Sequence, residues 1–431
     1  MASEMSISMR CNRLFATVMF LENKRKDEFW LFESCHASTM KLSTLKLLLP
    51  AVAITVQSNS ASTIIPPFLD DMRIPVGLIG TLISLSPIFA LASRLPLGMA
   101  YNHNRARMLI AISVVAMGIT NFAYSFAVDS LTFAIVHALN GFAYGAVTTL
   151  YMAFYVDSLA ADENRSHAMG YYVGSLAVGY STGNFVGGFI ADHFGYGLTF
   201  QSAAFLSLIP CALLWLFRSP MGQGAGKAKE KPKVKLTSKE FWRALLEPGL
   251  ATVVVTALFL NLLHQMSGVF ISLYGLAVGM TLTQIGVIRA AYAGVNAVTR
   301  PISGHIVNKV GHRGLSYGGI PLQCALLMLI PLFTGFSAIL IVYITSGLMR
   351  AIVIVANAVG LVQDVDETKV QRGIASAVYN SAGDLGNIIG PSLGGLIAQA
   401  TGIASVFVIG SLGSTVLFLL VIFAVHRMAR S

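Results

Sequence analysis

The stretch 218–243 reads RSPMGQGAGKAKEKPKVKLTSKEFWR and separates two long apolar blocks of the chain. Its six lysines make it strongly basic, and its glycine, alanine and proline residues cannot build a hydrophobic core. This composition is typical of a solvated linker. Apolar segments long enough to cross a bilayer recur on either side, six in each half. We therefore divide the chain into an N-terminal segment 1–40, a first bundle 41–218, a linker 219–246 and a second bundle 247–431.

The composition is that of a membrane protein. Hydrophobic residues make up 55% of the chain and charged residues 11%, with a mean hydropathy of +0.71. Soluble domains average about a quarter charged residues. The net charge of +10 raises the alternative of nucleic-acid binding. The basic residues gather in alternate loops, however, which is how a multi-spanning protein marks its cytoplasmic side. We therefore predict no nucleic-acid partner.

Twelve apolar runs are candidates for membrane spans. They lie near 45–67, 76–99, 108–128, 131–156, 168–190, 197–217, 249–276, 283–305, 315–334, 337–361, 374–398 and 402–425. Because only a helix satisfies its own backbone in hydrocarbon at this length, we predict an all-α protein of twelve transmembrane helices in two pseudo-symmetric bundles. With both termini inside, the inner side collects 26 of the 29 lysines and arginines, including those at span ends. This predicts cytoplasmic termini and a multi-pass protein of the cell membrane.

The N-terminal segment 1–40 has two interpretations. It contains a short apolar run, too short to span, and no small-residue cleavage site follows where a signal peptide would have one. It is either a cytoplasmic extension, or translation begins at Met40, where MKLSTLKLLLP reads as a natural start.

Two pairs of related sequences indicate an internal repeat. SRLPLGMAYNHNRAR (93–107), after the second span, matches TRPISGHIVNKVGHR (299–313), after the eighth, at an offset of 206 residues. A glycine pattern in the fifth span matches one in the eleventh at an offset of 207. The paired glycines are Gly179, Gly183 and Gly187 with Gly386, Gly390 and Gly394. Two similar six-helix units are the plan of many secondary transporters.

These residues resemble the major facilitator superfamily, and the resemblance runs from Met40 to the C-terminus. The loop after the second span is similar to the family's signature, which helps to hold one conformation closed. Both copies carry asparagine where the family usually has aspartate. The resemblance implies that spans 1, 4, 7 and 10 line a central cavity, that 2, 5, 8 and 11 form the moving interface, and that 3, 6, 9 and 12 face lipid. It assigns gating to Arg94, Gly98, Asn102, Arg300, Gly304, Asn308 and Arg313.

The glycine pattern is similar to the family's antiporter motif. Only the eleventh span has the full Gly-Pro form, with Pro391, whereas the fifth has Asn184 at that position. Glycines at i, i+4 and i+8 leave a smooth strip where another helix approaches closely. The pattern therefore favours antiport, and plain helix packing is the alternative.

The fourth span carries His137-x-x-Asn140-Gly141. It is similar to a family pattern that begins with arginine and is linked to proton transfer. Histidine titrates in the range that such a role needs. The alternative is a structural histidine whose hydrogen bonds are satisfied inside the bundle.

Three charged residues fall inside predicted spans: Arg289, Arg350 and Asp384. A charge at that depth costs several kcal/mol, so it usually faces a cavity or a partner. Asp384 lies about a dozen residues into its span, roughly 18 Å along the helix, near the midplane. One hypothesis makes Arg350 an anion or hydrogen-bond site for the solute and Asp384 a proton carrier. The other is a static Arg350–Asp384 ion pair.

Polar side chains on the same helices predict a wet cavity for an organic solute with polar groups. They are Gln57, Asn59, Ser60, Asn140, Tyr144, Asn261, His264, Gln265, Tyr292, Asn296, Asn357, Tyr379, Asn380 and Asn387. Singly, each could be a buried hydrogen bond between helices.

The sequence has no nucleotide-binding loop, no His/Cys metal cluster and no nucleophile motif, and its four cysteines form no disulfide framework. We therefore expect no cofactor, no metal and no enzymatic activity. We predict a monomeric secondary transporter that moves a small organic solute by alternating access, coupled to protons as an antiporter that exports. The alternatives are symport or uniport of a polar or anionic metabolite, and a membrane sensor that does not transport.

Overall fold

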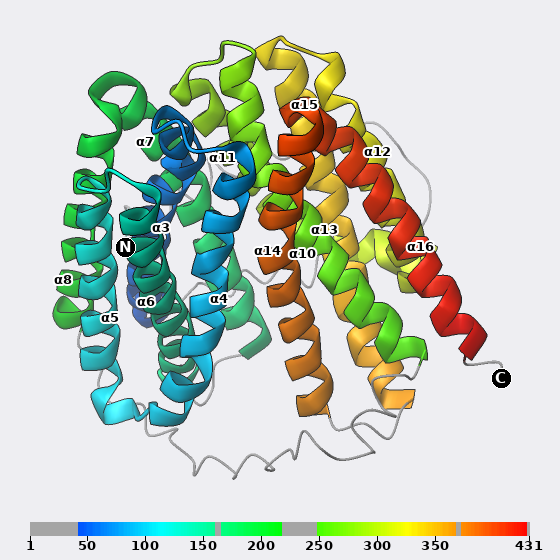
Figure 1. Cartoon of the computed structure of the whole chain (residues 1–431). Helices are drawn as coiled ribbons and strands as arrows, with labels where there is room; N and C mark the ends of the chain where they lie inside the picture. Colours follow the sequence, from blue (N-terminus) through cyan, green and yellow to red (C-terminus); the bar gives the residue numbers. More distant parts are fainter. Residues whose placement is uncertain (1–41, 160–164, 218–247, 368–371, 429–431) are drawn as a thin grey trace, which may run out of the picture. The chain divides into compact units, whose positions relative to one another are not determined.

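The computed structural model describes residues 42–159, 165–217, 248–367 and 372–428 (Figure 1). Among these residues every regular element is a helix. The N-terminal segment 1–40 and its alternative start at Met40 lie outside the described residues, as do the whole linker 219–246 and residues 429–431.

The described helices follow the predicted spans. In the first half they are α3 (Leu42–Asp71), α4 (Val76–Ala100), α5 (His103–Tyr124), α6 (Ser130–Asp157), α7 (Arg165–Leu206) and α8 (Leu208–Leu216). In the second half they are α10 (Pro248–Ala277), α11 (Leu282–Val310), α12 (His312–Met328), η1 (Ile330–Leu332), α13 (Phe336–Glu367), α14 (Arg372–Thr401), α15 (Ile403–Ser405), η2 (Val406–Gly410) and α16 (Ser411–Met428). The all-α fold class predicted from the sequence is confirmed.

The element α7 comprises two helices that meet at a kink between the fifth and sixth predicted spans. Gly195 lies at this kink with φ 81°. This left-handed conformation suits glycine, which has no Cβ, so a single residue makes the turn. Nine stretches of the described chain are long and apolar enough to cross a membrane, counting α7 and α8 together. Helices α11 and α14 are not among the nine. The twelve-helix count thus stays a prediction with which the helix boundaries agree.

The two halves meet along two helix pairs, α4 with α14 and α7 with α11. Glycines allow the close approach. A Cβ on Gly80 would lie 3.0 Å from Gly395 Cα, and one on Gly188 would lie 2.9 Å from Gly286 Cα. The Thr283 hydroxyl also donates to Asp192 Oδ2 at 2.6 Å between α11 and α7. These four helices are spans 2, 5, 8 and 11, the predicted interface.

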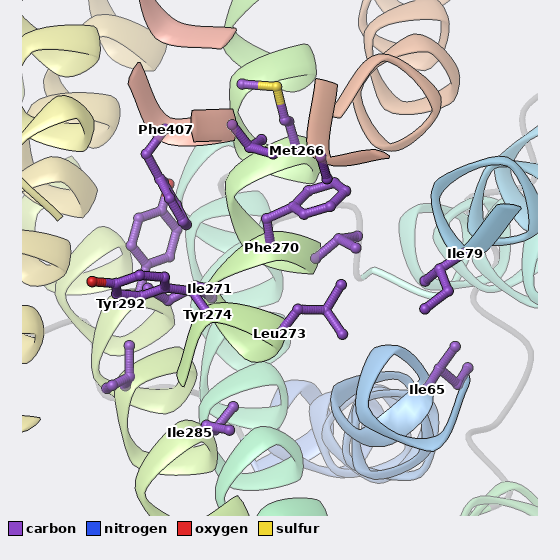
Figure 2. Packing of buried hydrophobic residues seen from close by; sticks show 14 of the residues in the cluster. Ile65, Ile79, Met266, Phe270, Ile271, Leu273, Tyr274, Ile285, Tyr292 and Phe407 are labelled. Atoms are coloured by element: carbon purple, nitrogen blue, oxygen red, sulfur yellow. The ribbon is translucent and has the colours of Figure 1, made fainter. Parts of the chain in front are cut away.

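The hydrophobic core joins the halves at one end only. One cluster contains Ile65 and Ile79 of the first half together with Phe270, Leu273 and Ile285 of the second half (Figure 2). In the predicted topology these residues lie toward the outer side. Toward the inner side the buried residues form two separate clusters, one in each half. Among the described residues, buried apolar packing therefore joins the halves toward the predicted outer end and not toward the inner end.

Candidate functional site

A cavity of about 600 Å³ lies between the two halves. Its lining comes from α3, α4, α6, α7, α10, α11, α13 and α14, and among the described residues α5, α8, α12 and α16 contribute nothing to it. The resemblance implied a lining from spans 1, 4, 7 and 10 alone. The lining found here is wider, because residues of the four interface helices α4, α7, α11 and α14 also contribute to it.

The cavity is unevenly charged. Its described lining holds four arginines, Arg94, Arg289, Arg300 and Arg350, and one carboxylate, Asp384. Two of these arginines were expected in gating loops. Both instead lie inside helices, because α4 continues to Ala100 and α11 to Val310.

Asp384 of α14 pairs with Arg94 of α4, across the two halves. The predicted alternative of an Arg350–Asp384 pair is wrong: the Arg350 guanidinium donates instead to Asn261 Oδ1 at 3.1 Å. Helix α4 packs directly on α14, so Arg94 is the arginine within reach. The side chain of Asp384 is 13% exposed and that of Arg94 is 36% exposed. The pair is therefore partly open to the cavity.

The other arginines are held by neutral groups. Arg300 Nε donates to Asn296 Oδ1 at 3.0 Å on its own helix. Arg289 donates to the Gly268 carbonyl at 3.0 Å and to the Ser272 hydroxyl at 3.3 Å. Within the described part of the chain, neither these two nor Arg350 has a salt bridge to a carboxylate. Their positive charges face the cavity uncompensated.

Aromatic rings form part of the same wall. His264 and Tyr292 stack with ring centroids 5.5 Å apart, and Tyr292 packs on Tyr343 at 4.6 Å. On the opposite half the Tyr144 and Tyr180 hydroxyls lie 3.4 Å apart. Tyr180 and Tyr343 were missed from the sequence, since a tyrosine in an apolar run carries no mark of its orientation.

His137 lines the cavity but is already bonded. Its Nδ1 lies 2.6 Å from the Tyr124 hydroxyl, its Nε2 lies 3.3 Å from the Ile83 carbonyl, and the residue is 5% exposed. These contacts agree with the alternative of a structural histidine. Asn140 is similarly occupied, donating to Thr120 Oγ1 at 2.8 Å and to Asn121 Oδ1 at 3.0 Å.

The structure divides the predicted polar residues into two groups. Those that line the cavity are Asn59, Asn140, Tyr144, Asn261, His264, Gln265, Tyr292, Asn296 and Asn387. Those that do not belong to the lining are Gln57, Ser60, Asn357, Tyr379 and Asn380. Gln57 and Asn357 are fully buried, and Asn357 donates to the Val253 carbonyl at 3.0 Å, while Asn380 is exposed. Sequence alone places a residue in a helix without saying which way it points.

The remaining signature residues differ between the two copies. Asn102 caps α5 by accepting the Asn104 N–H at 3.0 Å, a role that asparagine fills as well as aspartate. Asn308 is exposed near the end of α11, and α12 instead begins after Gly311 at φ 87°. A Cβ on Gly98 would lie 3.7 Å from Thr149 Cγ2, and Gly304 has open space around it. Arg313 is exposed in the first turn of α12.

The repeated glycines pack helices within each half. Cβ atoms on Gly179, Gly183 and Gly187 would collide with α3, and those on Gly386, Gly390 and Gly394 with α10. Pro391 lies inside α14. A Cβ added to Gly80 of α4 would collide with the Pro391 carbonyl oxygen. The glycines that face the other half are their neighbours Gly188 and Gly395.

Comparison of the sequence with known protein families agrees with the helical fold, the central cavity and the internal repeat. The profile of the Major Facilitator Superfamily matches residues 47–370. The chain belongs to this superfamily. It is a multi-pass membrane transporter.

Transporters with low sequence identity to this chain match most of its length. An uncharacterised MFS-type transporter of Methanocaldococcus jannaschii is 22% identical over 343 residues, which cover 79% of this chain and 87% of the relative. The multidrug resistance protein MdtG of Klebsiella pneumoniae is 24% identical over 346 residues, 77% of this chain and 79% of that protein.

Solved structures share the fold. The inward-facing, unoccupied structure of a bacterial homologue of the human lysosomal transporter Spinster superposes with a TM-score of 0.69 at 15% identity, over 89% of this chain and 94% of that one. The nucleoside transporter NupG gives a TM-score of 0.71 at 14% identity, over 90% of this chain and 100% of that one.

Proposed function

We propose that this chain is a proton-coupled secondary transporter of a small organic solute, with Asp384 as the proton carrier. The main support for this proposal is the salt bridge between Arg94 and Asp384. Asp384 is the one carboxylate among the described lining residues, and its partner belongs to the other half of the protein. A proton on Asp384 would remove the charge that Arg94 binds and so weaken a link between the halves.

The coupling follows from the position of this pair. Alternating access requires the halves to part on one side and close on the other. The halves contact each other along α4–α14, where the pair lies. A proton therefore biases the same movement that exposes the solute cavity, so proton and solute change each other's affinity. The other titratable groups in the described second-half wall of the cavity are Arg289, Tyr292, Arg300, Tyr343, Arg350 and His264.

Two directions of coupling each have support. Export in exchange for protons is favoured by the Gly-Pro motif at Pro391 and by the names of the multidrug resistance relatives. Movement of solute and proton together is favoured by the cationic lining, because protonation of Asp384 would free Arg94 for a solute. Both directions use the same carrier residue.

Reconstituted vesicles test the proposal and separate the two directions. The purified protein is placed in vesicles, and accumulation of a metabolite panel is measured with the interior acid and then with the interior alkaline. An antiporter concentrates its solute on the acid side and a symporter on the alkaline side, whichever way the protein is inserted. Equal accumulation under both gradients would mean uncoupled transport and would overturn the proposal.

A further inference from the structure

The cavity lining has an excess of positive charge, which bears on the charge of the solute that the cavity would bind. Four arginines and one carboxylate line the cavity, and that carboxylate is already paired with Arg94. Three positive charges are left in the described lining with hydrogen bonds only to neutral groups. Unpaired charges away from water are costly, so such groups usually serve a ligand of opposite sign.

Two of these arginines form a pair of like charges. Arg300 of α11 and Arg350 of α13 lie close enough for their charges to repel. Arg289 and Arg350 both lie within electrostatic reach of His264 on α10. Nothing in the described lining relieves this repulsion, because Asp384 interacts with Arg94. An anion between Arg300 and Arg350 would relieve it.

Hydrogen-bond donors at the same place are unused. Arg350 is 7% exposed, and its Nε has no hydrogen-bond partner in the described structure. The Tyr292 hydroxyl is buried and equally without a partner there. Both residues line the cavity. A guanidinium edge and a hydroxyl are donors that match the oxygens of a carboxylate or phosphate.

We infer that the solute is an organic anion whose carboxylate or other oxyanion group binds between Arg300 and Arg350, with Tyr292 donating a further hydrogen bond. The inference rests on the proposed function, since it assumes that this cavity carries the solute. The stacked rings of His264 and Tyr292 give the non-ionic part of such a molecule an aromatic wall. A volume of about 600 Å³ suits a small metabolite.

An anionic solute also selects the direction of coupling. Negative charge in the cavity favours a proton on Asp384, and the proton in turn releases Arg94 to act on the anion. Solute and proton then strengthen each other's binding. Such positive coupling between solute and proton binding is typical of symport. An anionic solute therefore favours symport over antiport.

Binding by the purified full-length protein tests the inference. Thermal stabilisation is titrated with benzoate, phenyl phosphate and benzenesulfonate, and with the matched neutral and cationic probes benzamide and benzylamine. Ligands that bind only the folded state raise its melting temperature according to their affinity. We expect at least one anion to stabilise the protein and to bind about tenfold more tightly than benzamide, the gain of one charge-assisted hydrogen bond.

Variants locate the site. Arg350→Gln should weaken anion binding about tenfold or more, and Arg350→Lys should keep the preference for anions with lower affinity, because it keeps the charge but loses the planar fork. Arg73→Gln is the control, since Arg73 is exposed in the loop between α3 and α4 and outside the cavity lining. The melting temperature without ligand checks that each variant is folded.

The outcomes separate the inference from the proposed function. Stabilisation by benzamide or benzylamine equal to that by the anions overturns the inference, and so does the absence of stabilisation by any anion. Anion binding that Arg350→Gln leaves unchanged overturns the assigned site. If anion binding depends on Arg350 but a pH gradient does not drive solute accumulation in vesicles, the anion site is supported. The proposed proton coupling is then overturned.

Discussion

Arg94 on α4 and Asp384 on α14 form an ion pair that connects the two halves of the protein. The two residues are 290 positions apart in the chain. Both line the central cavity, and they lie on helices that pack against each other. The pair therefore connects the cavity with the contact between the halves, as the proposed coupling requires.

A double-mutant cycle tests the pair itself. Arg94→Ala and Asp384→Ala should each lower stability, while the double variant should lose less than the sum, with a coupling energy of about 1 kcal/mol. The estimate is modest because Arg94 is 36% exposed and its charge is partly screened. Thermal unfolding in detergent measures the four proteins. Additive losses would mean that the two residues do not interact.

Close packing at the predicted outer end should hold the cavity shut on that side. A side chain at Gly80 meets the backbone of α14, with Gly395 Cα at 3.0 Å. Gly80→Val should part the helices there, since overpacking costs roughly 1–3 kcal/mol. A cysteine at the lining residue Ser86 should then react with an external impermeant thiol reagent about tenfold faster.

Gly98 on the same helix supplies the control for Gly80. Its Cβ would lie in ordinary contact, 3.7 Å from Thr149 Cγ2, so Gly98→Ala should leave the reactivity of the cysteine at Ser86 unchanged. Equal effects of the two variants would show that packing against α14 does not control access.

His137 should matter for stability and not for proton coupling. Its ring bonds the Tyr124 hydroxyl and the Ile83 carbonyl in a buried site. His137→Phe keeps the ring but leaves the buried Tyr124 hydroxyl without this partner, so stability should fall by about 1–3 kcal/mol. Gradient-driven accumulation in vesicles should persist. A folded variant of normal stability that no longer responds to the gradient would restore the proton-transfer hypothesis.

The orientation in the membrane, with both termini cytoplasmic, is a prediction from the distribution of lysines and arginines among the loops. Cysteines placed at Asn104, after α4, and at Gly222, in the linker, should not react with an impermeant thiol reagent outside intact cells. One at Ser130, the first residue of α6, should react. Labelling at Asn104 without labelling at Ser130 would reverse the orientation.

Much of the fold could be read from the sequence. Span positions follow from apolar runs of bilayer length, and the family follows from two repeats at nearly equal offsets. Both signals are local or periodic. The helical turn at Gly195 could not be read this way, because a glycine in an apolar run does not reveal its backbone angle.

The site was less accessible to sequence reasoning. Arg350 and Asp384 were found because charges in apolar spans are conspicuous, but their partners were not. Arg94 appeared to belong to a loop, and its pairing with Asp384 depends on the packing of α4 on α14. Gln57 and Asn357 were included because they are polar, although both are buried outside the cavity lining. Rotation of a helix about its axis decides such cases.

The most direct measurement is accumulation driven by a pH gradient in vesicles that hold either wild-type protein or Asp384→Asn. The substitution keeps the shape of the side chain and removes its titration. We predict that the variant still exchanges solute across the membrane without a gradient, and that its response to the gradient is lost. A variant that accumulates solute as strongly as the wild type under the same gradient would contradict the claim that Asp384 carries the proton.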